Sequence, residues 1–330
     1  MCAMKLKVAR LFTLSLLVLL CSTVVLPVTL AYPAVEPKPV VPQQSATPFP
    51  SPVPVPTSTP LPLSGKVVFL DPGHGRDANG KYKWGGCITE DGALVYVEAD
   101  IVLSFALRAK QKLEAQGATV YLTREDSYMA GNYRRMAQLH IFALENTFPL
   151  DGELRALLTD MQAIYDGFAS GENKSSSGLE KIYFNTPYRK TRNIRPATKA
   201  LFDLEAAFAD RVLFISLHTN ASAAVHSGTM VYYVDNKTNT KYYTNYQEAR
   251  NKKLAEALFK YIPQEISLPA QGIARNDYFM LREHNFPAAL VEVGYHSNPT
   301  DRAILTDPAT PDKLARGIYL AVCAYFEVAP

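Results

Sequence analysis

The sequence predicts an α/β protein with a largely parallel, buried sheet and a helical insertion. Apolar runs of strand length alternate with segments of helical pattern after about residue 65, as in folds that pack helices against a parallel sheet. One stretch, at about residues 132–209, departs from this alternation because it contains helical patterns and no convincing strand. The 330 residues suffice for one large domain or two small ones.

The alternating part begins with an apolar strand and ends with a helix. The expected strands are Lys66–Asp71, Ala118–Thr123, Arg211–Leu217, Gly228–Val234 and Ala288–Gly294. The expected helices are Ala99–Gln116, Asn245–Ile262 and a last helix that Thr310 caps, with Pro311 as its first residue. In such sheets, functional side chains gather at the carboxyl ends of the strands.

The insertion at about residues 132–209 is expected to be helical throughout. Its helical patterns are Asn132–Asn146, Asp151–Ala169 and Arg195–Ala209. A polar loop, Gly171–Ser177, separates the second pattern from the third and offers a flexible joint. We expect this segment to be a helical insertion into the α/β domain.

The N-terminus, residues 1–31, has the pattern of an export signal. Three basic residues, Lys5, Lys7 and Arg10, precede an uncharged and mostly apolar run from Leu11 to Leu30. Small side chains favour cleavage after Ala31, although the apolar run is long enough to remain as a membrane anchor. Both alternatives predict an exported protein that is extracellular, periplasmic or associated with the cell wall, and that touches the membrane only through this segment.

Residues 32–64 predict a disordered linker. Eleven prolines occur in this segment, without a period and without an apolar pattern that a core would need. An extended polyproline chain of this length reaches roughly 100 Å. The segment is expected to be either a spacer that holds a domain away from the membrane or a passive tail, and in both cases the working domain comprises residues 65–330.

Composition and charge exclude some classes of protein. The chain is 48% hydrophobic and 20% charged, which is ordinary for a globular protein. A net charge of +3 without a basic run gives no reason to expect nucleic acid. Only Cys87 and Cys323 remain after the N-terminal segment, so the sequence predicts neither a disulfide framework nor a CxxC metal site.

Two histidines and one glutamate form a candidate metal site. His74 follows the first strand directly, and His218 follows the expected strand Arg211–Leu217. Parallel strands would bring both imidazoles to one rim of the sheet, and Glu98 opens the helix that follows the loop after His74. Two imidazoles and a carboxylate, with a fourth position left to water, are typical of catalytic zinc sites.

Glu292 is a candidate general base. It lies inside Ala288–Gly294, an otherwise apolar strand, where burying an unpaired carboxylate costs several kcal/mol. A structural glutamate satisfied by neighbours is the alternative. Burial would raise the pKa of this carboxyl, whereas a nearby metal ion would lower it.

Four sequence blocks in order carry a resemblance to a known family. The blocks are Asp71-Pro72-Gly73-His74-Gly75 followed by Glu98, Leu122-Thr123-Arg124, Ser216-Leu217-His218-Thr219-Asn220-Ala221, and Val291 to Pro299 (VEVGYHSNP). Together they resemble the zinc-dependent N-acetylmuramoyl-L-alanine amidases of the Amidase_3 type. The resemblance implies a mixed, mostly parallel sheet with helices on both faces, of the phosphorylase/hydrolase-like kind.

The resemblance also implies roles for individual residues. It assigns one zinc ion to His74, Glu98 and His218, and the catalytic role to Glu292. The chain departs from the family in three places. The gap from His74 to Glu98 is longer than usual, which makes Glu90 a rival ligand; the residues after Glu98 differ; and His296 stands where the family tends to have leucine and is expected to reach the substrate.

The activity implied is hydrolysis of the amide bond between N-acetylmuramic acid and L-alanine in peptidoglycan. The residues alone indicate only a metal hydrolase, so a zinc carboxypeptidase or deacylase and a non-catalytic wall-binding module remain alternatives. In some amidases of this type an inserted helical segment covers the zinc until a protein activator displaces it. The insertion here is expected either to act in that way or to shape the groove.

Other polar residues are weaker candidates. Asp71 is expected either to orient His74 or to cap the strand, and Asn220 and Arg282 either to contact substrate or to lie on the surface. Tyr82 and Trp84 lie in the loop between the first two ligands, where aromatic rings either stack on sugars or pack under the loop. The remaining histidines are expected to be structural: His140, His226 and His284.

Overall fold

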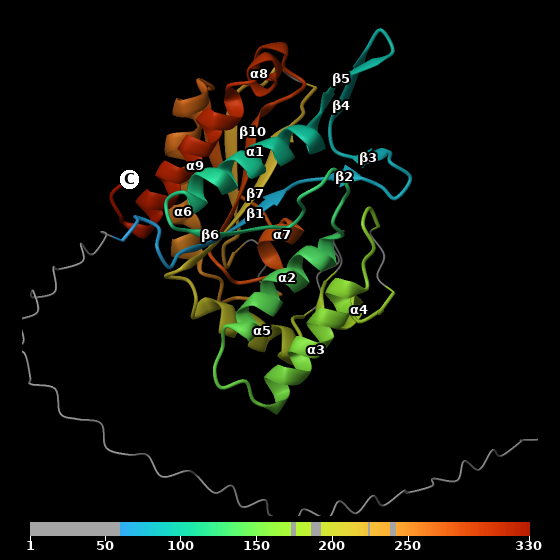
Figure 1. The fold of residues 1–330 in the computed structure, drawn as a ribbon, viewed down its shortest axis with the longest axis vertical. Coiled ribbons are helices and arrows are strands. Elements are labelled where there is room, and N and C mark those ends of the chain that lie inside the picture. Colours follow the sequence, from blue (N-terminus) through green and yellow to red (C-terminus); the bar gives the residue numbers. More distant parts are fainter. Residues whose placement is uncertain (1–59, 173–175, 186–192, 224, 238–241) are drawn as a thin grey trace, which may run out of the picture. The chain divides into compact units, whose positions relative to one another are not determined.

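A six-stranded mixed sheet forms the centre of the structure (Figure 1). Its strand order is β6–β1–β7–β10–β8–β9. The strands are β1 (Val67–Pro72), β6 (Thr119–Leu122), β7 (Val212–Asn220), β8 (Thr229–Tyr233), β9 (Ala270–Arg275) and β10 (Ala288–Tyr295). The first four strands in this order are parallel, whereas β8 is antiparallel to β10 and β9 is parallel to β8. The prediction of a mixed, mostly parallel sheet is confirmed.

The computed structural model describes residues 60–172, 176–185, 193–223, 225–237 and 242–330. The expected signal segment at residues 1–31 and nearly all of the proline-rich segment at 32–64 lie outside these ranges. Within the described ranges, none of the helices combines the length and the apolar character that crossing a membrane requires.

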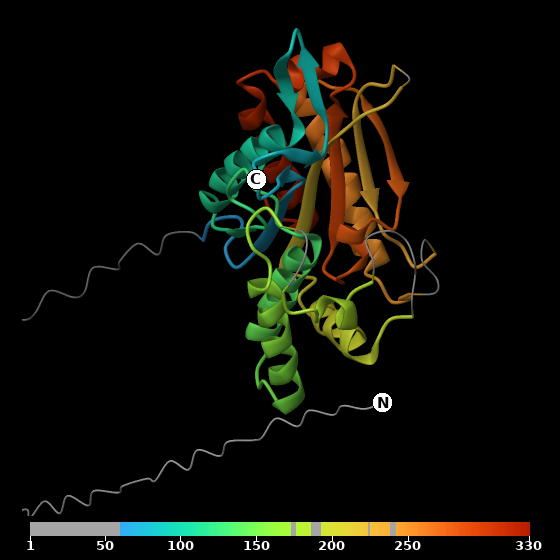
Figure 2. The same ribbon diagram turned by 90° about the vertical axis from the view of Figure 1, so that its right-hand side faces the viewer.

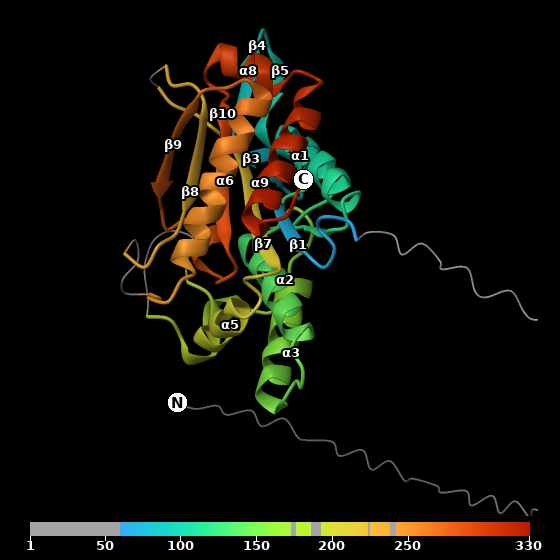
Figure 3. The ribbon, with the colours of Figure 1, turned by 90° about the vertical axis from the view of Figure 1, so that its left-hand side faces the viewer.

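Three long helices cover one face of the sheet, α1 (Glu98–Glu114), α6 (Glu248–Ile266) and α9 (Thr310–Phe326) (Figure 3). Successive side chains of a strand point to opposite faces, so Val68 and Leu70 of β1 pack against these helices while Phe69 points the other way. On that second face lie helices α2 (Asn132–Glu145) and α5 (Pro196–Ala206). Helices therefore cover both faces of the sheet.

The expected helical insertion contains α2, α3 (Gly152–Asp166), the short α4 (Glu180–Tyr183) and α5. Figure 2 shows these helices gathered at one end of the described part of the chain. Their apolar side chains, among them Met161, Ile164 and Phe202, join Phe69 and Phe214 of the sheet in one buried cluster. The insertion is thus part of a hydrophobic core, and excising it would expose that core.

A hairpin projects from the segment between β1 and α1 (Figures 1 and 2). After the short strands β2 (Gly75–Arg76) and β3 (Tyr82–Trp84), the chain forms β4 (Cys87–Glu90) and β5 (Ala93–Val97), which pair antiparallel. Asp91 and Gly92, with φ angles of 50° and 80°, make its two-residue turn. The hairpin was not predicted, although an Asp-Gly pair is a recognised sequence signal for such a turn.

Several details differ from the expectations. Strand β9 and the short helices α7 (Phe279–Arg282) and α8 (Pro299–Leu305) were not expected. Helix α6 ends at Ile266, about one turn beyond Ile262, where the prediction ended it, and so contains Pro263. Thr310 does not cap α9, because its hydroxyl donates to the carbonyl of Ile304. Cys87 is exposed on β4 and Cys323 is buried in α9, and neither forms a disulfide.

Candidate metal centre

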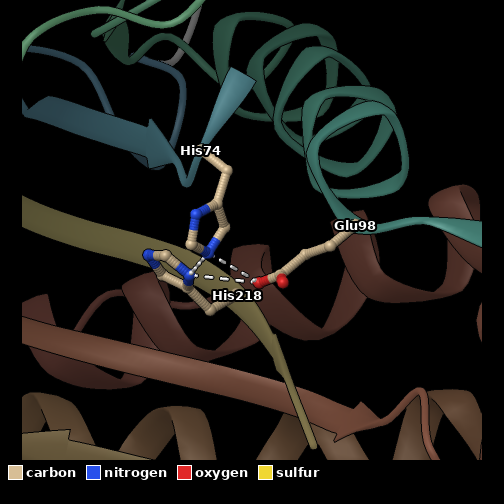
Figure 4. A group of neighbouring side chains, drawn as sticks. All are labelled: His74, Glu98 and His218. Carbon is tan, nitrogen blue, oxygen red and sulfur yellow. Dashed lines mark hydrogen bonds and ion pairs between the residues drawn. The ribbon is translucent and has the colours of Figure 1, made fainter. Parts of the chain in front are cut away.

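Three side chains predicted from the sequence converge at the carboxyl ends of β1 and β7 (Figure 4). His218 Nδ1 lies 3.0 Å from His74 Nε2 and 3.2 Å from Glu98 Oε1, and His74 Nε2 lies 3.2 Å from the same oxygen. The three atoms therefore form a nearly equilateral triangle. Among the described residues this is the one group of three or more histidine, cysteine or acidic side chains whose ligand atoms are close enough to share a metal ion.

The loop after β1 aims His74 at this point. His74 adopts a φ of 62°, which is uncommon for a residue other than glycine, so the surrounding structure must impose it. The buried guanidinium of Arg124 does so by donating to the carbonyls of Pro72 and Gly73, at 2.9 and 2.8 Å. Sequence reasoning gave Arg124 no role, although a charged residue at the end of an apolar strand is a signal for one.

The chain around His218 is equally constrained. His218 lies near the end of β7, where Leu217 pairs with Pro72 of β1. A Cβ atom on Gly73 would stand 2.1 Å from Cε1 of the His218 ring, so only glycine fits beside this imidazole. The Asp-Pro-Gly-His block therefore supplies one candidate metal ligand, His74, and its glycine leaves the space that the other, His218, occupies.

Glu98, rather than Glu90, joins the two histidines. It is the first residue of α1, it is buried, and backbone N–H groups donate to both of its oxygens, Gly86 to Oε2 at 2.7 Å and Thr219 to Oε1 at 3.0 Å. Glu90 lies at the tip of the hairpin, where its exposed carboxylate pairs with Arg302 at 2.9 Å. The structure thus separates the two candidates that the sequence left open.

The electrostatics of the triangle favour a cation. Burial raises the pKa of Glu98, but hydrogen bonds from His218 and His74 outweigh it and hold that pKa well below the ordinary value. Burial lowers the pKa of His74, which favours its neutral imidazole. Burial also lowers the pKa of His218, but the hydrogen bond to Glu98 outweighs it and raises that pKa, so a positive charge is stabilised beside the carboxylate. Metal binding requires the ionised carboxylate and releases any proton held by the imidazoles.

Glu292 lies beside the triangle on the neighbouring strand. It pairs in register with His218, so both side chains point to the same face of the sheet. Its Oε2 atom is buried and has no hydrogen-bond partner among the described residues. Burial raises the pKa of Glu292 to about 7, against the lowering effect of His218. A carboxyl group with a pKa near neutrality can both accept and donate a proton.

Other predicted residues lie elsewhere. Asp71 does not touch His74; it is fully buried and accepts hydrogen bonds from Thr123, Ser216 and Arg135. The ring of His296 is packed inside the protein with 6% exposure, and its contact with substrate stays a prediction.

The remaining candidates have structural partners. Arg282 is buried against Glu283, so it is neither a surface residue nor exposed to a ligand. Asn220 accepts a hydrogen bond from its own neighbour, Ala221. Tyr82 donates to Asp100, and its hydroxyl accepts from Arg76 at 2.7 Å. The structure describes no side-chain position for Trp84.

The donor set fits a small, borderline-soft divalent metal ion. With donors at about 2.0–2.1 Å from a tetrahedral zinc ion, neighbouring donors lie about 3.3 Å apart, close to the 3.0–3.2 Å of this triangle. Two imidazoles and one carboxylate leave one tetrahedral position open. Glu292, whose Oε2 has no hydrogen-bond partner among the described residues, lies on the adjacent strand in register with His218 and points to the same face of the sheet. Such an arrangement supports hydrolysis, in which a metal and a carboxylate share one water molecule.

Comparison with known proteins places these features in one family. The family model described as N-acetylmuramoyl-L-alanine amidase matches residues 68–143 and 199–324, together more than half of the chain. The match breaks at residues 144–198, which include α3 and α4. His74, Glu98, His218 and Glu292 all lie inside the matched ranges.

Individual relatives share between about a fifth and somewhat over a quarter of their aligned residues with this chain. The chain is 28% identical over 270 residues to the germination-specific N-acetylmuramoyl-L-alanine amidase of Bacillus subtilis, covering 80% of this chain and 81% of that protein. It is 24% identical over 271 residues to the probable cell wall amidase LytH of Staphylococcus aureus, covering 80% of this chain and 60% of LytH. Among solved structures, the catalytic domain of the amidase CwlV from Bacillus (Paenibacillus) polymyxa superposes with a TM-score of 0.48 at 21% identity, covering 80% and 99% of the two chains.

Proposed function

The chain belongs to the N-acetylmuramoyl-L-alanine amidase family, and from this premise we propose that His74, Glu98 and His218 hold one zinc ion while Glu292 is the general base. As a member of this family, the protein is an amide hydrolase of the bacterial cell wall, and its substrate is peptidoglycan. The observation that carries the zinc site is the triangle of three donor atoms at 3.0–3.2 Å. When bound there, zinc supplies Lewis-acid chemistry to the scissile carbonyl group and lowers the pKa of a water molecule.

Glu292 moves the proton that hydrolysis requires. Its carboxylate accepts a proton from the attacking water, whose oxygen forms the new bond to the lactyl carbonyl carbon of N-acetylmuramic acid. The C–N bond to L-alanine then breaks, and Glu292 returns the proton to the departing amine nitrogen. The products are a free lactyl carboxylate on the glycan and an intact stem peptide. The burial that raises the pKa of Glu292 to about 7 makes this return favourable.

The hydrogen bonds of the two carboxylates in the site set different protonation behaviour for Glu98 and Glu292. Glu98 stays ionised because two backbone N–H groups and two imidazoles surround it. Glu292 has no such donors on Oε2, so its protonation state is free to change during the reaction. Two carboxylates in one site are thus divided between a fixed ligand and a proton carrier by their hydrogen bonds.

The helical insertion is proposed to support the site rather than to block it. Its apolar side chains are shared with the sheet, and no acidic side chain among the described residues 132–209 joins the three ligand atoms. The loop after α3 contacts the segment that follows His74, because the N–H of Ala78 donates to the carbonyl of Gly171 at 3.1 Å. We propose that a protein activator acting on the insertion would influence the site through this contact.

The N-terminal residues are proposed to export the domain and to space it from the membrane. The basic and apolar pattern of residues 1–31 supports a signal peptide or signal anchor, and the prolines of residues 32–64 support a linker. The working domain then comprises residues 65–330 and acts outside the cytoplasmic membrane.

Two measurements test the proposed site. The purified protein is expected to contain one zinc ion per chain by elemental analysis, and His218→Ala is expected to contain none. Digestion of peptidoglycan followed by mass spectrometry is expected to release whole stem peptides. Full zinc occupancy in His218→Ala would refute the ligand set, and release of terminal amino acids alone would indicate a carboxypeptidase.

A further inference from the structure

We propose that His296 is a positioning residue for the metal centre: its ring holds the two backbone segments whose N–H groups orient the carboxylate of Glu98. The proposal rests on the metal site proposed above. His296 follows β10 directly and stands where the family resemblance leads one to expect leucine. Its ring is buried, with 6% of the residue exposed, and His296 is not one of the three side chains of the metal triangle.

The carboxylate of Glu98 is held by its neighbours' backbone. The N–H of Gly86 donates to Oε2 at 2.7 Å, and the N–H of Thr219 donates to Oε1 at 3.0 Å. The N–H of Glu98 in turn donates to the carbonyl of Gly86 at 2.8 Å. The orientation of Glu98 therefore depends on where Gly86 and Thr219 are held.

His296 touches both of these residues. Its Nδ1 forms a hydrogen bond with the hydroxyl of Thr219 at 3.1 Å. A Cβ atom on Gly86 would stand 2.1 Å from Cε1 and Nε2 of the same ring, so the backbone of Gly86 lies directly against the imidazole. One ring thus contacts the sources of both hydrogen bonds to Glu98.

Tyr96 completes the support. Its ring stacks on His296 with centroids 5.1 Å apart and an interplanar angle of 18°. Its hydroxyl shares a hydrogen bond of 2.8 Å with the hydroxyl of Thr219. The Thr219 hydroxyl therefore lies between Tyr96 and His296, and all three side chains are buried. A buried network of this kind holds its members in one arrangement.

The hairpin explains why this chain needs such support. Glu98 follows β5 directly, and Gly86 precedes β4, so both lie at the base of a hairpin that projects from the domain (Figure 2). Any movement of the hairpin would be passed to the ligand. His296 contacts the base on both sides, at Gly86 and at Tyr96, and its own N–H donates to the carbonyl of Asn220 at 2.9 Å. The hairpin base is thereby fixed to β7 and β10.

The expected consequence is a change in metal affinity. Residues that orient metal ligands typically contribute 10–100-fold to metal affinity or activity. We expect His296→Ala to weaken zinc binding by about this factor, measured as the dissociation constant in competition with a chromophoric chelator. His296→Leu retains bulk beside Tyr96 but has no ring nitrogen, so it is expected to weaken zinc binding as well.

Matched variants separate this role from a general loss of folding. His226→Ala removes an exposed histidine and is expected to keep the wild-type zinc affinity. Thr219→Ser keeps the hydroxyl that His296 and Tyr96 bind, whereas Thr219→Val removes it, so the serine variant is expected to bind zinc more tightly than the valine variant. Thermal unfolding of each metal-free protein shows which variants fold.

The outcomes distinguish the two proposals. If the wild-type protein binds no zinc, or binds zinc that His218→Ala does not abolish, the proposed metal site fails and the role of His296 is not at issue. If wild-type protein binds zinc and the folded His296→Ala and His296→Leu variants bind it equally tightly, the positioning role is refuted. Should His296→Ala not fold, His296→Leu and the Thr219 pair decide, and equal affinities of the serine and valine variants would refute the role.

Discussion

Among the described residues, histidine and glutamate side chains meet at two places, and only one of them resembles a metal site. His74 Nε2 lies 3.2 Å from Glu98 Oε1 at the rim of the sheet. His140 Nδ1 lies 2.7 Å from Glu205 Oε1 between α2 and α5. The second pair is shorter and more deeply buried, with neither side chain exposed. Short distance and burial therefore do not identify the functional pair.

The two pairs differ in what their remaining atoms do. Glu205 Oε2 accepts the N–H of Asn285 at 2.6 Å, and the His140 ring stacks against Phe184 and Phe202. No third ligand atom meets that pair within the described residues. At the rim, a second imidazole converges on the same oxygen, and the His74 side chain is 24% exposed. A metal site needs converging lone pairs and access. In the pair of His140 and Glu205, His140 Nε2 has no hydrogen-bond partner among the described residues, but it is fully buried and no further ligand atom converges on the pair.

The largest expected effect tests the rim. Glu292→Gln is nearly isosteric but cannot accept the proton of water, so turnover on peptidoglycan is expected to fall by about 10²–10⁴-fold. Zinc content is expected to stay at one ion per chain, because Glu292 is not among the ligands. Elemental analysis and a dye-release assay check both statements. Turnover within a few-fold of wild type would make Glu292 a structural residue.

The next effect tests the buried pair of His140 and Glu205, here called the core pair. Glu205→Ala leaves His140 Nδ1 and the N–H of Asn285 without their partner in a buried region. Each buried group without a partner costs about 1–3 kcal/mol, so the loss of two partners is expected to lower the free energy of unfolding by about 2–6 kcal/mol in urea titrations. Zinc affinity is expected to remain unchanged.

Glu98→Ala is the matched variant in the other pair. It removes a ligand and is expected to abolish stoichiometric zinc binding. The comparison would break down if Glu205→Ala, once folded, also lost zinc, because the core pair would then be coupled to the rim.

A third, smaller effect is a dependence of the protein's stability on pH, which arises from His284 in the same buried cluster. His284 is buried; its Nε2 donates to the carbonyl of Met280, and its Nδ1 accepts the N–H of Phe286. Burial lowers the pKa of His284 to about 4, and a proton on Nδ1 would face the Phe286 N–H. The unfolded chain, with an ordinary pKa near 6.5, binds more protons below that pH. Stability is therefore expected to fall as the pH drops from about 6.5 towards 4.

The magnitude for His284 is about 2 kcal/mol between pH 7 and pH 5. Urea titrations of metal-free wild type and His284→Gln at both pH values isolate it, because glutamine does not titrate. The variant is expected to lose less stability on acidification by that amount. Equal losses in the two proteins would assign the acid sensitivity to other groups.

The sequence predicted the rim better than the core. The rim residues follow apolar strands directly, so the topology of a parallel sheet places His74 and His218 together, and the order of motifs indicated the family. The same reasoning left His140 and His284 as structural residues, which agrees with their contacts. It could not identify Arg124 or Thr219, because their roles are hydrogen bonds to or from backbone groups that only the folded chain brings near.

The sequence analysis did not predict strand β9 or the burial of His296, because both depend on contacts between segments that are distant in the sequence. Strand β9 has a mixed sequence, AQGIAR, and becomes a strand only because β8 offers it an edge. His296 was expected at the substrate because its chemistry is that of a functional residue. Its position is decided instead by Tyr96 and Gly86, which are about 200 residues away in the sequence. The sequence could not show that this histidine is buried.

The smallest expected effect concerns Glu90, the ligand candidate that the sequence could not separate from Glu98. In the structure Glu90 forms an exposed ion pair with Arg302 at the hairpin tip, and such pairs contribute about 0–1 kcal/mol. Glu90→Ala is therefore expected to change the free energy of unfolding by less than about 1 kcal/mol and to keep full zinc content. Arg302 also donates to the carbonyl of His296 at 3.4 Å, so a loss of zinc affinity in Glu90→Ala would show that the tip, and not only the base, of the hairpin holds the ligand in place. Loss of zinc in Glu90→Ala together with its retention in Glu98→Ala would mean that the structure has assigned the third ligand wrongly.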